Sequence, residues 1–135
     1  MYYRSVNRTI KDWSRFDPRV VDMIIELVEE FSAIIVISST WRFGAIKQLN
    51  SELTKSGLKK FLHKEWKTLQ VHPSHRGTEI KMWLDKHPEV TNYVIIDDDI
   101  NILDEQTSHL VQTNIEFGMQ NGHLINARGI LSISK

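Results

Sequence analysis

Two short apolar runs, each followed at once by polar residues, constrain the fold of this chain more than any other feature. Residues 33–38 read AIIVIS and residues 93–96 read YVII. Each run is too short for a helix, and the first is apolar at successive positions, as in a parallel strand that is covered on both faces. The chain is therefore expected to build a sheet with buried central strands.

Apolar residues at helical spacing fill the segments between these runs. Asp17 followed by Pro18 is typical of a helix start, because the aspartate caps the first turn and proline fits the first helical position. The expected helices are residues 18–31, a helix that contains Ile46, Leu49 and Leu53 and ends in a left-handed cap at Gly57, and residues 78–87. Further strands are expected at residues 66–71 and 109–113. This order predicts an α/β fold with a mainly parallel sheet.

Length and composition limit the class of protein. A chain of 135 residues with 41% apolar residues is expected to form one domain over residues 1–135. The absence of cysteine excludes disulfides, thiolate metal sites and cysteine nucleophiles, and it fits a reducing compartment. Residues 1–13 are polar and basic, with no apolar stretch that could form a signal peptide or a membrane span. We therefore expect a cytoplasmic protein without a membrane partner.

Charge is unevenly spread along the sequence, although the net charge is zero. Residues 41–87 carry ten Lys or Arg against four acids, whereas residues 88–135 carry two against seven, and residues 1–40 carry five against six. A basic and an acidic half fit a site for a phosphate and a divalent cation. Solvated helix faces produce such blocks more often, so charge alone favours the simpler interpretation.

Polar side chains follow both buried runs, and the topology is expected to bring them together. In open parallel sheets, ligands bind beyond the carboxyl ends of the strands. Ser39 or Thr40 could donate to a phosphate oxygen there, and Arg42 could pair with phosphate through two hydrogen bonds. Asp97 and Asp98 could hold Mg²⁺, which prefers carboxylate oxygens. The two strand ends thus predict one crevice for phosphate and metal.

Each of these patterns also has a simpler explanation. Hydroxyls after a strand commonly cap the next helix, and an acidic triplet is usually a turn. Arg76 and Lys81 add positive charge near the same edge, but both could lie on a solvated helix face. The coincidence of two strand ends with complementary chemistry favours the site. The histidines have no spacing typical of zinc ligands, and His63, His72, His75 and His87 are expected at the surface.

Three longer segments resemble a known family. They are FDPRVVDMIIELVEEFSAIIVISSTWR, HRGTEIKMWLDKHPEVTNYVIIDDD and HLVQTNIEFGM. Together they resemble the haloacid dehalogenase (HAD) superfamily, specifically the HAD domain of Swiss Army Knife RNA-repair proteins. The similarity covers about residues 16–120. The resemblance implies a Rossmann-like, three-layer α/β sandwich with a mainly parallel sheet.

The resemblance also implies roles for individual residues. In HAD phosphatases a hydroxyl binds the phosphoryl group, a basic residue steadies the phospho-enzyme, and an acidic pair completes the Mg²⁺ site. Carried over to this sequence, these are Ser39 for the hydroxyl, Arg76 or alternatively Lys81 for the basic group, and Asp97 with Asp98 for the metal, with Asp99 as a substitute. Ser39 and Arg76 are therefore the candidate catalytic residues.

One family motif is missing from the sequence. HAD enzymes attack phosphate with an aspartate in a DxDG motif after the first, central strand, and this chain contains no DxDG. The acids before residue 22 are Asp12 and Asp17, and neither follows an apolar strand. Residues 1–16 are thus an atypical N-terminal segment, and the sheet is expected to lack its usual first strand.

Two functions follow from this departure. The first is a HAD-like domain that descends from Mg²⁺-dependent phosphatases of nucleotide or nucleic-acid phosphates but does not turn over. The alternative is an active phosphatase whose nucleophile strand lies upstream of this chain or is supplied from outside it. The expected partners are a phosphorylated small molecule or a nucleic-acid end, and a second copy of the chain could cover the incomplete sheet.

Overall fold

The structure is a computed structural model that describes residues 16–38, 46–69, 75–114 and 117–133. The α-helices are α1 (Pro18–Phe31), α3 (Ile46–Ser56), α4 (Arg76–Asp85) and α5 (Asn121–Leu131). The strands are β1 (Ile35–Ile37), β2 (Leu62–Lys67), β3 (Ile95–Asp97) and β4 (Leu110–Gln112). Two short 3₁₀ helices, η2 (Leu58–Phe61) and η3 (Asp104–His109), precede β2 and β4.

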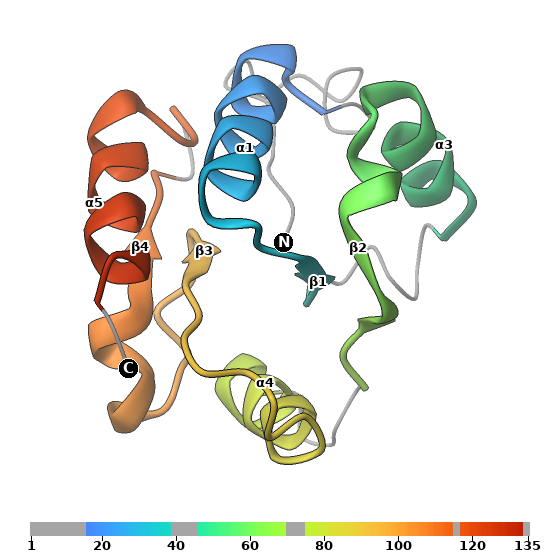
Figure 1. Ribbon diagram of the computed structural model, residues 1–135. Coiled ribbons are helices and arrows are strands. Elements are labelled where there is room, and N and C mark those ends of the chain that lie inside the picture. The colour runs from blue at the N-terminus through green and yellow to red at the C-terminus, as the bar shows by residue number, and fades with distance from the viewer. Residues whose placement is uncertain (1–15, 39–45, 70–74, 115–116, 134–135) are drawn as a thin grey trace.

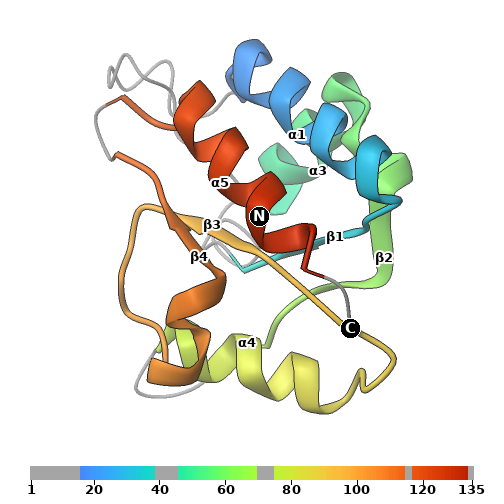
Figure 2. The same cartoon turned by 60° about the vertical axis from the view of Figure 1, so that its left-hand side comes forward.

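The strands form a layer between helices, as the α/β prediction requires. Helices α1, α3 and α5 lie on one side of the strands and α4 lies on the other (Figures 1 and 2). Strand β1 pairs in parallel with β2, and β3 pairs in parallel with β4. Within the described residues these pairs are two separate two-stranded sheets. The predicted loss of a first strand concerns the N-terminal segment, which lies outside those residues.

Helix α1 begins and ends where the sequence predicts. Asp17 caps its first turn, because the Oδ1 atom of Asp17 accepts a hydrogen bond of 2.9 Å from the backbone N–H of Arg19. Ser32 ends the helix in a left-handed conformation with φ of 50°. The apolar face of α1 is buried along its length; its members are Val20, Val21, Met23, Ile24, Leu27 and Val28. Local signals alone therefore define this helix.

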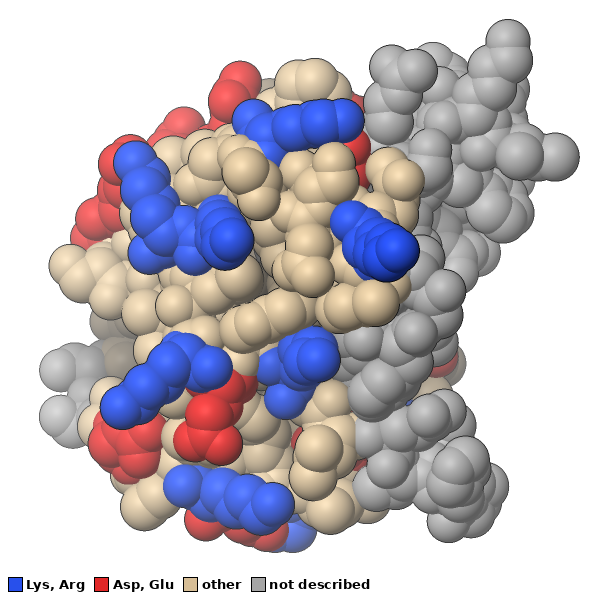
Figure 3. Space-filling view, turned by 90° about the vertical axis from the view of Figure 1, so that its right-hand side faces the viewer, with Lys and Arg blue, Asp and Glu red and all other residues tan. Residues whose placement is uncertain are grey.

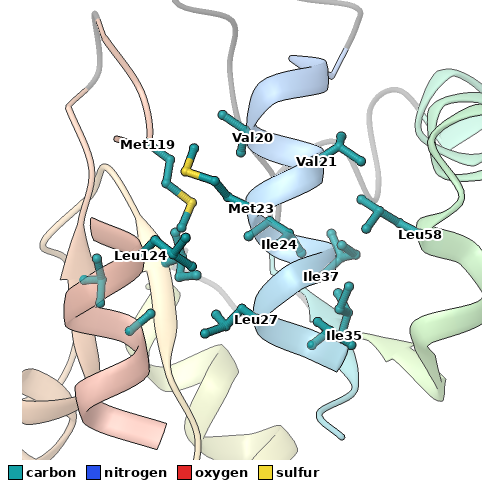
Figure 4. Close-up of a cluster of buried hydrophobic side chains, with 14 of the residues drawn as sticks. Val20, Val21, Met23, Ile24, Leu27, Ile35, Ile37, Leu58, Met119 and Leu124 are labelled. Atoms are coloured by element: carbon teal, nitrogen blue, oxygen red, sulfur yellow. The ribbon is translucent and has the colours of Figure 1, made fainter. Parts of the chain in front are cut away.

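This apolar face of α1 is the centre of the hydrophobic core. Figure 4 shows it pointing toward Ile35 and Ile37 of β1 and toward Met119 and Leu124 near α5. Ile37 and Met119 are fully buried. Each such side chain stabilises the fold by about 1.5–3 kcal/mol through removal of apolar surface from water. The core thus fixes β1 and α5 against α1.

Strand β2 departs from the prediction. It covers Leu62–Lys67, whereas a strand was predicted over residues 66–71. Ile35 pairs with Leu62 and Ile37 pairs with Lys67, so a step of two residues in β1 matches a step of five in β2. The pairing is therefore irregular between Leu62 and Lys67, and this stretch of β2 with three extra residues is called the bulge below. The predicted boundary was wrong because HKEWK has no apolar alternation that would mark a strand.

The other predicted elements are present with shifted ends. Helix α4 covers Arg76–Asp85 instead of residues 78–87, β3 covers Ile95–Asp97 instead of 93–96, and β4 covers Leu110–Gln112 instead of 109–113. Helix α3 ends before Gly57, which has the predicted left-handed conformation with φ of 82°. None of the helices in the described part of the chain is long and apolar enough to cross a membrane.

Helix α5 was not predicted from the sequence. Its segment NGHLINARGIL contains two glycines and has no clear apolar stripe, so local propensity gives it little support. Tertiary contacts hold it instead. Arg128 of α5 forms ion pairs with Glu26 and Glu30 of α1, and Leu124 and Ala127 are buried.

Gly77 sets how closely the start of α4 approaches the loop that follows β3. A Cβ atom at this position would lie 2.5 Å from the backbone nitrogen of Leu103 and 2.7 Å from the Cα atom of Ile102. The N–H of Gly77 donates to the carbonyl of Asn101 over 3.0 Å. Backbone therefore packs directly on backbone, and only glycine fits this position.

We expect Gly77→Ala to lower the free energy of unfolding by about 1–3 kcal/mol, because the added methyl group would force two backbone segments apart. Urea denaturation would measure this change. The matched control is Gly129→Ala in α5, where a Cβ atom would meet nothing within 4 Å. That control should be neutral or stabilise by roughly 0.5–1 kcal/mol. Equal effects of the two substitutions would contradict the close approach.

Candidate functional site

An ion pair stands at the carboxyl end of β3. The Nη1 atom of Arg76, at the start of α4, donates to the Oδ2 atom of Asp97. The Oδ1 atom of Asp97 accepts from the backbone N–H of Asp99 over 3.0 Å. The side chains of Arg76 and Asp97 are only 16% and 13% exposed. A cation and a carboxylate therefore meet in a largely desolvated position at the strand end.

A network of hydrogen bonds fixes the start of α4 on the loop after β3. The buried Gln106 side chain is its centre: its Nε2 atom donates to the carbonyl of Gly77 over 2.9 Å. Its Oε1 atom accepts from the N–H of Leu103, also over 2.9 Å. At the start of α4, the Nδ1 atom of His75 accepts from the N–H of Thr78 over 3.2 Å. Arg76 is thereby held over Asp97.

Burial and charge act in opposite directions on Asp97. Burial raises the pKa of Asp97 above its usual value, and the neighbouring carboxyl of Asp98 acts in the same direction. The Arg76 guanidinium and the N–H of Asp99 oppose this rise in the pKa of Asp97. The ionised carboxylate therefore depends on nearby positive charge, which Arg76 supplies.

The structure brings some of the predicted site residues together and separates others. Arg76 contacts Asp97, and Asp98 follows it half-buried at the end of β3. Lys81 instead pairs with Asp85 on its own helix, with 3.1 Å between Nζ and Oδ2, and both side chains are exposed. Arg76 is thus the predicted basic residue that reaches Asp97. Ser39, Thr40 and Arg42 lie outside the described residues, so their predicted roles stay predictions.

A cavity of about 620 Å³ lies beside this strand layer, but it is not the polar site. Its lining is mainly apolar and comes from α1, β1, α4 and the segment leading into β3; examples are Phe31, Ile35, Trp83 and Ile96. Neither Arg76 nor Asp97 lines it. This cavity is therefore suited to apolar groups, whereas the charged side chains of Arg76 and Asp97 lie at the strand end.

The prediction that the histidines lie at the surface was wrong for His87. Its side chain is only 6% exposed. The hydrogen bond to the Trp83 carbonyl raises the pKa of His87 most. Glu65 and Glu89 also raise this pKa, whereas burial lowers it. His63 and His75 are half-buried, and His72 lies outside the described residues. His63 and His87 come together because β2 contacts the end of α4, where the Nε1 atom of Trp83 donates to the carbonyl of Glu65 over 2.8 Å. No regular sequence spacing signals such a contact.

Comparisons with known proteins give one finding. Residues 3–124 match the family described as the HAD domain in Swiss Army Knife RNA repair proteins. No curated protein and no solved structure matches the chain. The family match spans nearly all of the described elements, including β1, β3 and the start of α4, where the candidate site lies.

We expect Arg76→Met to lower the free energy of unfolding at pH 7 by roughly 1–3 kcal/mol, because it leaves a largely buried carboxylate without its cation. The pKa of Asp97 in the folded protein lies above its ordinary value of 3.8, so folding favours the neutral carboxyl. This contribution to the free energy of unfolding is fully present below pH 3.8, and it is lost as the pH rises through the folded-state pKa. Without Arg76, the pKa of Asp97 rises further. The cost of Arg76→Met should therefore be larger at pH 7 than below pH 3.8.

Urea denaturation at the two pH values would measure this difference. Lys81→Met removes a cation of the same helix from an exposed pair with Asp85, and it should leave the stability nearly unchanged at both pH values. A cost of Arg76→Met that is independent of pH would show that the ion pair with Asp97 is not what Arg76 contributes.

Proposed function

Because this chain belongs to the family of HAD domains in Swiss Army Knife RNA repair proteins, we propose that it binds Mg²⁺ and a phosphorylated nucleotide or nucleic-acid end without transferring the phosphoryl group. The observation that carries this proposal is the pairing of Arg76 with Asp97 at the carboxyl end of β3. In parallel sheets this is the edge at which ligands bind. The sequence lacks the DxDG motif that would supply the family's nucleophile.

Asp97 and Asp98 fit a magnesium ion by their chemistry. Mg²⁺ is the ion that HAD proteins generally use, and it prefers carboxylate oxygens and water. Burial disfavours the charge of Asp97, so a cation at this strand end would be stabilising. When bound, the ion would supply positive charge toward phosphate oxygens. Asp97 and Asp98 would hold it.

Arg76 is placed to contact the phosphate itself. Among the described residues, Asp97 is the one hydrogen-bond partner of the Arg76 guanidinium, and it uses only Nη1. A guanidinium carries five N–H donors in a planar fork, so donors remain for a second anion. Ser39 would add a hydroxyl from the segment after β1. These groups bind and orient phosphate, but none is a carboxylate placed for in-line attack.

Asp17 caps a helix in the structure, and this contact supports the proposal that Asp17 is not a nucleophile. Its carboxylate caps α1 through the N–H of Arg19 and lies 3.8 Å from the Arg19 guanidinium. Asp12, the other acid before residue 22, lies outside the described residues. We therefore propose that phosphoryl transfer by this chain alone is absent.

The second candidate is an active phosphatase whose nucleophile strand comes from outside this chain. One observation favours it: β1 and β3 belong to separate two-stranded sheets within the described residues, so each of these strands has an edge there at which an added strand could pair. A second copy of the chain that covers this region is a further proposal. Mass measurement of the protein in solution would detect such a homodimer.

A nucleic-acid end is favoured over a small phosphorylated molecule by a basic face over α3, η2 and β2. It consists of six exposed lysines: Lys47, Lys55, Lys59, Lys60, Lys64 and Lys67. Figure 3 shows the side of the molecule on which α3 and β2 lie, with Lys and Arg spread across it. Of the two acids within residues 46–69, Glu52 is buried and accepts from the N–H of Phe16 over 2.8 Å. The exposed charge of this segment is thus strongly positive, which suits a phosphate backbone.

Two of these lysines lie beside aromatic rings. The Nζ atom of Lys60 is 5.2 Å from the Phe61 ring, and that of Lys67 is 5.3 Å from the Trp66 ring. Lysines interleaved with aromatic side chains can bind single-stranded nucleic acid through phosphates and through base stacking. Lys67 is also the last residue of β2, so the basic face extends to the carboxyl end of that strand.

We expect Mg²⁺ to raise the melting temperature of the protein, because a ligand that binds only the folded state stabilises it by about 2.7 kcal/mol at a concentration of 100 times its Kd. Thermal melts with and without millimolar MgCl₂ would measure this shift. Asp97→Asn should abolish the shift, whereas Asp85→Asn, which removes an exposed acid of α4, should retain it. An equal shift in wild type and Asp97→Asn would place the ion elsewhere.

We expect Lys60→Glu combined with Lys67→Glu to weaken binding of a 5′-phosphorylated, single-stranded oligoribonucleotide at least about tenfold. If the two lysines contact phosphates, the slope of log K against log salt should fall by about 1.4. Fluorescence anisotropy over a salt series would measure both quantities. The control combines Lys81→Glu in α4 with Lys86→Glu directly after it, which changes the charge by the same amount. The same loss in that control would show that net charge, and not the basic face, determines binding.

A further inference from the structure

A cluster of metal-ligating side chains lies apart from the Arg76–Asp97 pair. His63, His87 and Glu89 each offer one ligand atom, and these atoms all lie within 4.8 Å of one another. The Nε2 atom of His63 is 4.0 Å from the Oε2 atom of Glu89. The Nε2 atom of His87 is 2.9 Å from the Oε1 atom of Glu65. Two imidazoles and two carboxylates therefore converge on one small region.

The fold builds this cluster from two separate segments. His63 and Glu65 lie in the bulge of β2, and His87 and Glu89 follow the end of α4. Trp83 joins the segments, because its Nε1 atom donates to the carbonyl of Glu65 over 2.8 Å.

Ring contacts fix the two histidines. The Trp83 and His87 rings are stacked with centroids 3.7 Å apart and planes 14° from parallel. The His63 ring meets both of them edge to face, at 5.1 Å from Trp83 and 5.0 Å from His87. The side chains of His63 and His87 are only 12% and 6% exposed. Packing thus orients both imidazoles before any ligand binds.

We propose that His63, His87 and Glu89, with Glu65 as a fourth ligand, form a binding site for a transition-metal ion of the Zn²⁺ type. Imidazole nitrogen with carboxylate oxygen is a donor set that zinc accepts in four-coordinate sites, whereas Mg²⁺ prefers oxygen alone. Two carboxylates would balance the charge of a divalent ion. This site is independent of the proposed phosphate site at Asp97.

The hydrogen bonds of His87 suit ligation through Nε2. Its Nδ1 atom lies 2.6 Å from the Trp83 carbonyl, which can only accept, so Nδ1 carries a proton. A metal-bound histidine commonly donates its other ring nitrogen to a carbonyl in this way, which fixes the ring and the ligating nitrogen. At Nε2, a metal ion would replace the proton shared with Glu65, and that proton would pass to solvent.

The remaining ligands need small adjustments. The side chains of Glu65 and Glu89 are 67% and 62% exposed, so they can change rotamer to reach zinc-ligand distances of about 2.0–2.2 Å. The Nδ1 atom of His63 accepts from the N–H of Glu65 over 2.9 Å. Ligation through Nε2 of His63 moves its ring proton to Nδ1 and breaks that exposed hydrogen bond. The metal bond replaces it.

Isothermal titration of the metal-free full chain with Zn²⁺ tests the proposal. We expect one ion per chain, and we expect Co²⁺ in its place to give the visible absorption of a four-coordinate nitrogen and oxygen site. Glu89→Gln changes an exposed side chain, so the variant should fold normally, and it should weaken Zn²⁺ binding by roughly 10-fold or more. His63→Gln should do the same.

Two controls make the result specific to this cluster. His123→Gln removes a histidine at the start of α5 and should leave the Zn²⁺ affinity unchanged, and so should Asp97→Asn at the other site. Millimolar Mg²⁺ should not displace the Zn²⁺. Absence of Zn²⁺ binding, or equal affinity in wild type and Glu89→Gln, would overturn the proposal without bearing on the Asp97 site.

Discussion

The close approach of α4 to the loop after β3 is the constraint on which the candidate site depends. Gly77 allows backbone to pack on backbone, and the buried Gln106 side chain joins the two segments through hydrogen bonds to both. Arg76 precedes this contact by one residue, so its guanidinium is directed onto Asp97. Gly77 therefore determines where the positive charge of the candidate site lies.

The sequence predicts the elements whose signals are local. Asp17, Pro18 and the apolar spacing that follows define α1, and the polar residues after two apolar runs locate the strand ends, because such signals require no knowledge of the tertiary fold. Helix α5 and the bulge of β2 depend on contacts between distant segments, such as Arg128 with Glu26 and Glu30. The sequence predicted only that Arg76 lies near the sheet edge that carries Asp97, and it did not predict the hydrogen bonds of Gln106.

The His63 and His87 cluster shows why sequence spacing missed a group of ligating residues. The two histidines are 24 positions apart in the sequence, and they meet because β2 contacts the end of α4, where Trp83 donates to the carbonyl of Glu65. The described residues thus form two polar clusters of different chemistry, the Arg76–Asp97 pair at the start of α4 and the histidine cluster at its end. Arg76 and the aspartates present hard oxygen and a guanidinium, whereas the histidine cluster presents imidazole nitrogen.

The central claim is that this domain binds phosphate and Mg²⁺ without phosphoryl transfer, and an assay of the unmodified chain with p-nitrophenyl phosphate and with 3′- and 5′-phosphorylated oligoribonucleotides tests it most directly. We expect no Mg²⁺-dependent turnover, because the sequence lacks the DxDG motif that would place a carboxylate in line with the phosphorus. A phosphate analogue should nevertheless bind in a manner that depends on Arg76 and Asp97. Robust Mg²⁺-dependent turnover that Asp97→Asn abolishes would contradict this account.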